Sequence, residues 1–161
     1  MSRLPNPADA YSPAEIAARV ETAGVAKARL PTLQTIVLGL LAGAFIAFGA
    51  MYYTVVVTDS GLGFGAERLL GGVAFSLGLV LVVVAGAELF TGNNLIAMAW
   101  ADKQVTTGQL LRNWGLVYLA NFVGAGMTAF IVHQAGVLQM HDGGVAKTAV
   151  ALASAKAALP F

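Results

Sequence analysis

The chain has 161 residues, of which 58% are hydrophobic and only 11% charged, and its mean hydropathy is +0.76. This composition lies well outside that of soluble domains and predicts an integral membrane protein. A net charge of +1 with no basic stripe offers nucleic acid no binding surface. The lack of cysteine excludes disulfides, thiolate metal sites and cysteine nucleophiles.

Residues 1–31 carry four of the nine Lys and Arg residues and are predicted to form a cytoplasmic segment that contains an amphipathic helix. Ser12 and Glu15 stand three residues apart, as in a capping box, so a helix is expected to begin there. Ile16 and Val20 begin a weak apolar stripe, which fits either a helix on the membrane surface or a solvated one. No signal-peptide pattern comes first, so the first span is expected to direct insertion.

Residues 32–140 are predicted to form the transmembrane region. Three spans are expected, near 33–57, 69–101 and 110–138. Residues 141–161 are predicted to form an outer turn and the approach to an incomplete fourth span.

The first span carries small residues at every fourth position, namely Gly39, Gly43 and Ala47. Such a face allows helices to approach closely. We therefore expect tight packing of this face, either within the protein or against a neighbouring subunit.

The second span is interrupted by the sequence GAELFTGNN at 86–94, which carries glycines, a carboxylate, a hydroxyl and two amides. Freed backbone groups cost several kcal/mol each in hydrocarbon, so such a break is expected only inside protein or along a cavity. Glu88 adds a charge, and intramembrane carboxylates commonly mark ion pathways. The segment therefore predicts a permeation path, with a plain loop between two short helices as the alternative.

Basic residues are distributed unequally between the two sides of the predicted spans. One side carries Arg3, Arg19, Lys27, Arg29, Lys103 and Arg112, and the other carries Arg68 and Lys147. The positive-inside rule then predicts a cytoplasmic N-terminus.

Three segments together resemble the formate/nitrite transporter family: GAELFTGNNL in the break, AGVAKA at 23–28 and RNWGLVYLANFVGA at 112–125. The resemblance implies an all-α membrane protein, in which this chain supplies the first three-helix repeat of an aquaporin-like inverted-repeat channel. It also implies a homopentamer with a pore in each protomer, located in the bacterial inner membrane. The family's second broken helix and its central histidine have no counterpart here, and His133 and His141 do not replace them.

The same resemblance assigns pore residues. Leu89, Phe90 and Thr91 would form the loop that enters the pore, and Phe75 and Leu79 would complete its apolar constrictions. Phe75 and Leu79 are four residues apart and share a helix face, so ordinary core packing is the alternative for them.

The resemblance further implies two buried charge pairs, Glu88 with Lys156, and Lys27 with a glutamate of the second repeat. Snorkelling to the interface is the alternative for both lysines. Asn94, Asn113 and Asn121 are expected to brace helices or broken backbone rather than touch substrate.

The implied function is passage of a small monovalent anion, with formate first and nitrite second. Hydrosulfide, acetate and lactate channels of the same family, and an inactive membrane fragment, are the alternatives. No nucleophile–base pair, paired carboxylates or metal spacing occurs, so we expect no enzyme, metal site or cofactor. The expected partners are the small anion, the lipid bilayer and other copies of the chain.

Overall fold

The computed structural model describes residues 11–160, and all regular structure within this range is helical. The elements are α1 Pro13–Ala28, α2 Thr32–Val57, α3 Phe64–Ala85, α4 Phe90–Asn93, α5 Ile96–Ala101, α6 Thr107–Gln134, the 3-10 helix η1 Val137–Gln139 and α7 Gly144–Ala157. Helices α2, α3 and α6 are long and apolar enough to cross a membrane. The all-α fold class is confirmed.

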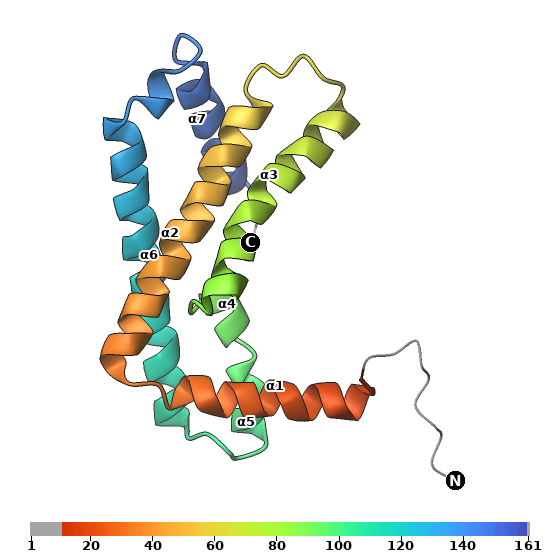
Figure 1. Ribbon diagram of the computed structural model, residues 1–161, viewed down its shortest axis with the longest axis vertical. Coiled ribbons are helices and arrows are strands. Elements are labelled where there is room, and N and C mark those ends of the chain that lie inside the picture. The colour runs from red at the N-terminus through yellow and green to blue at the C-terminus, as the bar shows by residue number, and fades with distance from the viewer. Residues whose placement is uncertain (1–10, 161) are drawn as a thin grey trace.

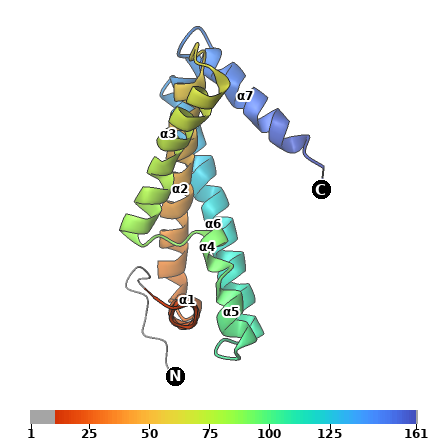
Figure 2. The same cartoon turned by 90° about the vertical axis from the view of Figure 1, so that its right-hand side faces the viewer.

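The three long helices form a bundle in which α2 contacts both α3 and α6 (Figure 1). Helix α1 crosses one end of the bundle and packs against α5. At the other end, α7 turns away from the bundle, as the rotated view shows (Figure 2). The break in the second span lies where α3 ends, beside α2 and α6.

Helix α1 begins as its sequence predicts. Glu15 and Ser12 form a capping box, with the Ser12 N–H donating to Glu15 Oε2 at 2.7 Å. This backbone donor lowers the pKa of the Glu15 carboxyl below its ordinary value. Residues 1–10 of the predicted N-terminal segment lie outside the described residues.

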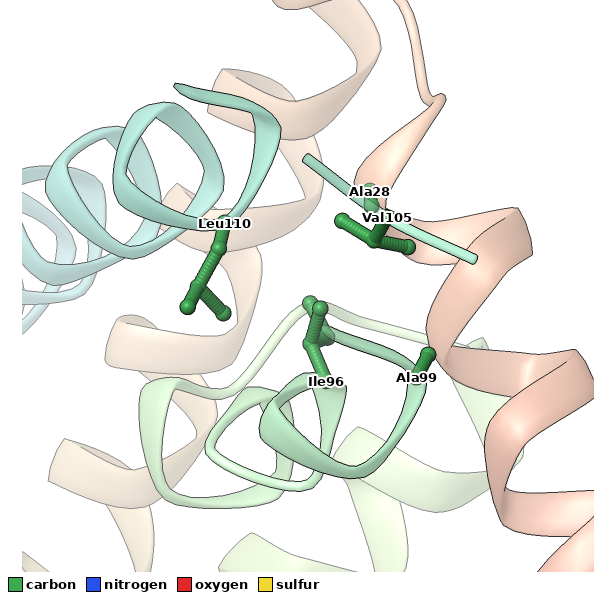
Figure 3. Close-up of a cluster of buried hydrophobic side chains, with 5 residues drawn as sticks. All are labelled: Ala28, Ile96, Ala99, Val105 and Leu110. Atoms are coloured by element: carbon green, nitrogen blue, oxygen red, sulfur yellow. The ribbon is translucent and has the colours of Figure 1, made fainter. Parts of the chain in front are cut away.

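A small apolar cluster fixes the other end of α1 (Figure 3). Its buried members are Ala28, Ile96, Ala99, Val105 and Leu110. They come from α1, α5, the loop after α5 and the start of α6, so burying them locks the crossing helix against the base of the bundle.

The small-residue face of α2 packs against α6 within the chain. A Cβ on Gly43 would overlap the backbone of Asn121, and one on Gly124 would overlap the backbone of Leu40. Gly39 is also close to α6, since its Cβ would lie 2.7 Å from that of Ala120. The predicted close approach is confirmed, and it is made inside one chain.

The span limits differ from the expected ones by several residues. The second span begins at Phe64 rather than near 69, and its first helix, α3, ends at Ala85. Helix α6 begins at Thr107 rather than near 110, because Thr106 and Gln109 form a capping box. It ends at Gln134 rather than 138.

Replacing Gly43 by Ala tests the α2–α6 contact. We expect the variant to lose about 1–3 kcal/mol of unfolding free energy, because the new methyl group meets backbone that cannot rotate away. The measurement is an SDS titration of the protein in detergent micelles. Gly115→Ala on α6 is the control, since a Cβ there meets nothing within 4 Å; equal destabilisation of both variants would contradict the packing argument.

Candidate functional site

The break in the second span is short and sharply defined. Gly86 adopts φ +61°, a left-handed conformation that glycine accepts without strain, and it ends α3. The chain then runs without helix to Leu89 before the single turn α4. Non-helical backbone therefore occupies residues 86–89, and a second interruption at Asn94 and Leu95 separates α4 from α5 (Ile96–Ala101).

Asn121, in the middle of α6, holds this irregular segment. Its Nδ2 donates to the carbonyl of Glu88 at 2.9 Å and to that of Gly39 at 2.8 Å. Its Oδ1 accepts from the N–H of Phe90 at 2.9 Å. The N–H of Glu88 donates to the carbonyl of Leu38 at 3.2 Å. These bonds pair three of the backbone groups freed by the break, namely the N–H and the carbonyl of Glu88 and the N–H of Phe90.

The ion pair at the break differs from the expected one. Glu88 is 3% exposed and lies 2.5 Å from the ammonium of Lys27, so the pair is Lys27–Glu88. The expected pairing of Glu88 with Lys156 is wrong in this structure. Lys27 occupies the last turn of α1, which crosses beside the break, whereas Lys156 is exposed near the end of the diverging α7 (Figure 2).

Two asparagines extend this pair into a buried polar cluster. Asn93 Nδ2 donates to Glu88 Oε2 at 2.7 Å and to Asn113 Oδ1 at 2.9 Å. Asn113 Nδ2 donates to the carbonyl of Lys27 at 3.1 Å, which closes a ring of four residues. In the structure Asn113 and Asn121 thus bond to the backbone of neighbouring helices, and Asn121 also bonds to the break.

The structure places Asn93 in this cluster rather than the predicted Asn94. Asn93 is fully buried, whereas Asn94 is exposed and its side chain forms none of the contacts that build the cluster. Consecutive helical residues point about 100° apart, so both cannot face the core. No local spacing could have shown which one, because Glu88 lies in the irregular segment before α4 and its separation of five residues from Asn93 follows no helical period.

A hollow of about 290 Å³ opens beside the break. Its lining combines the basic Lys27 with apolar and small side chains: Lys27, Leu79, Val82, Val83, Gly86, Ala87, Leu89, Gly92 and Asn93. The structure therefore brings together three of the residues predicted for a pathway, namely Lys27, Leu79 and Leu89.

The remaining predicted pore residues lie outside this lining. The ring of Phe90 packs edge-on against Tyr118 and Trp114 of α6, with centroids 5.3 and 6.4 Å apart. Phe75 is 40% exposed on α3, and Thr91 is exposed on α4. Phe90 thus contacts α6 and is not among the residues that line the hollow with Leu79.

The two histidines lie away from the break. His141 Nε2 is 2.9 Å from Asp59 Oδ2, and this contact joins the α2–α3 loop to the turn before α7. His133 lies in the last turn of α6. Within residues 11–160, no group of three His, Cys, Asp or Glu side chains is placed to hold a metal.

The formate/nitrite transporter family model matches residues 14–161 of the chain. The chain is 42% identical over 139 residues to the formate channel FocA of Escherichia coli K12, covering 86% of this chain and 49% of FocA. It is 38% identical over 152 residues to the uncharacterized transporter YrhG of Bacillus subtilis 168, covering 92% of this chain and 56% of YrhG.

A solved structure shares the fold. It is described as a pentameric formate channel with formate bound, and it superposes with a TM-score of 0.71 at 33% identity. The match covers 81% of this chain and 51% of the solved one. The chain thus spans about half the length of the relatives it matches.

A double-mutant cycle distinguishes the observed ion pair from the expected one. We expect Lys27→Met and Glu88→Gln to be coupled by about 1 kcal/mol in unfolding free energy, a value kept low because the Lys27 side chain is 33% exposed. Lys156→Met and Glu88→Gln should be additive. The free energies come from SDS titrations in micelles. The structure would be contradicted if Glu88 were coupled to Lys156 and not to Lys27.

Asn121 offers a second test. Asn121→Leu removes two hydrogen bonds to the break and one to Gly39 of α2, and we expect a loss of about 2–4 kcal/mol because buried polar groups are left unpaired. Asn121→Asp keeps the acceptor for the Phe90 N–H but loses both donations, so it tests the donor role at nearly constant volume. If Leu were tolerated as well as Asn in the same titration, the backbone of the break would need no support from α6.

Proposed function

Because the chain belongs to the formate/nitrite transporter family, we propose that it contributes a three-helix repeat to a pathway for small monovalent anions across the membrane. Formate is the first candidate substrate and nitrite the second. The pathway would run past the break between α3 and α4. The observation that carries this proposal is the hollow that Lys27, Leu79 and Leu89 line together.

Lys27 would attract the anion. An ammonium group has three N–H donors, and the contact with Glu88 Oε1 uses one of them. The side chain is one-third exposed beside the hollow, so the remaining donors are available to a carboxylate or a nitrite oxygen. Glu88 offsets the cost of partly burying the ammonium.

Leu79 and Leu89 would raise the free energy of a charged, hydrated ion in the pathway, because their side chains cannot replace its water. Moving an ion into a dry medium costs far more than moving a neutral acid. An anion that picks up a proton within the pathway would therefore pass the apolar lining more easily. Leu79 is 52% exposed, so it is available to face a passing solute.

The assembly and its placement are part of the same proposal. The solved relative is described as pentameric, which supports a homopentamer for this chain. The excess of basic residues around α1, α5 and the start of α6 supports a cytoplasmic N-terminus in a bacterial inner membrane. Thr91 would serve the pathway from the exposed face of α4.

Proteoliposomes that contain the purified chain test the proposal directly. We expect saturable uptake of isotopically labelled formate, competed by nitrite. Empty liposomes supply the background. Uptake no greater than this background would favour the inactive membrane fragment over a working pathway.

Substitution of the apolar lining tests the route. We expect Leu79→Ala or Leu89→Ala to speed formate passage or admit larger anions such as lactate, because water then enters the hollow and lowers the desolvation cost. A barrier lower by about 1.4 kcal/mol corresponds to about tenfold faster passage. Val84→Ala is the control, since Val84 is 80% exposed on another face of α3. Unchanged rates and selectivity in both lining variants would place the route elsewhere.

A further inference from the structure

The amide of Asn93 lies at the centre of the buried polar cluster and connects three parts of the chain. Its two Nδ2 protons go to the loop carboxylate of Glu88 and to Asn113 on α6. Its backbone carbonyl accepts from Trp114 Nε1 at 3.0 Å. The residue also lines the hollow together with Lys27. Asn93 is therefore held rigidly, and it holds Glu88 in turn.

We propose that Asn93 is a positioning residue that fixes the Glu88 carboxylate through one oxygen, so that the Lys27 ammonium keeps free N–H groups for an anion. This inference rests on the function proposed above. The carboxylate divides its oxygens, with Oε1 on Lys27 and Oε2 on Asn93. Without the amide, Oε2 would be buried with no partner, and the carboxylate would rotate to place both oxygens on Lys27.

The unused half of the amide supports this role. Asn93 Oδ1 is buried and has no hydrogen-bond partner. Turning the amide over would not help, because Oδ1 would then face Glu88 Oε2 and Asn113 Oδ1, which are both acceptors here. Leaving Asn93 Oδ1 buried and unpaired is unfavourable. The same orientation of the amide allows Nδ2 to donate to both Glu88 and Asn113.

The ring also positions Lys27 from its backbone side. Asn113 accepts from Asn93 and donates to the Lys27 carbonyl, so the end of α1 and the loop carboxylate are set by the same pair of amides. A displacement of Asn93 would change both the pairing of the ammonium and its approach to the hollow. The effect reaches the anion through Lys27, with no direct contact from Asn93 required.

The test compares two adjacent asparagines. Asn93→Leu removes the donors at similar volume, and Asn93→Ala is a second variant in case the larger apolar side chain prevents folding. Asn94→Leu is the matched control, because Asn94 is exposed and takes no part in the ring. Each protein is reconstituted in liposomes, and formate uptake is measured over a range of concentrations.

We expect the Asn93 variants to raise the KM for formate about tenfold, equivalent to about 1.4 kcal/mol of anion binding. The maximal rate per folded protein should change little, whereas a purely structural defect would lower the maximal rate and leave KM unchanged. Asn94→Leu should match the unsubstituted chain. An unchanged KM in a folded Asn93 variant would overturn the inference.

A second measurement does not depend on transport. The rate at which Lys27 is labelled by an amine-reactive reagent, read by peptide mass spectrometry, should fall in the Asn93 variants because the ammonium is more fully paired. If the unsubstituted chain takes up no formate, the proposed function fails, and slower labelling of Lys27 would still support the positioning role. Labelling equal to that of Asn94→Leu would overturn it.

Discussion

The structure depends on satisfying the backbone of a helix that is broken at membrane depth. In hydrocarbon each unpaired N–H or carbonyl costs several kcal/mol, so the break requires partners supplied by neighbouring helices. Asn121 supplies most of them, and it reaches both α2 and the loop only because Gly39 and Gly43 let α6 approach closely. The glycine face of α2, the asparagine of α6 and the break between α3 and α4 therefore depend on one another, although they are far apart in the sequence.

The charge at the break depends in the same way on a distant element. Glu88 is buried, and a buried carboxylate needs a partner and hydrogen bonds to both oxygens. Lys27 provides the charge only because the apolar cluster around Ile96 and Ala99 locks α1 across the base of the bundle (Figure 3). Apolar packing at the base thus determines which lysine reaches Glu88, and α7, which diverges from the bundle, contributes nothing to the pair.

Local signals in the sequence predicted the elements well, and long-range choices less well. The capping box at Ser12, the charge-free span of α2 and the glycines that interrupt the second span each act over a few residues, so they can be read directly. The partner of Glu88 could not be read in this way, because it depends on how α1 crosses the bundle. The choice between Asn93 and Asn94 depends on the phase of a four-residue helix, which begins only after an irregular segment whose length the sequence does not reveal.

If anions pass through the hollow as proposed, it would act on them in two opposing ways. The positive charge of Lys27 is balanced by Glu88, so the pair has no net charge, and its attraction acts at short range through the N–H groups that remain free. The leucines, by contrast, penalise any solute that keeps a large hydration shell. A small anion that binds through one or two oxygens gains the short-range attraction and brings little water with it. Discrimination among anions at this site would therefore depend on the geometry of a single lysine, and that geometry is set by the amides beneath it.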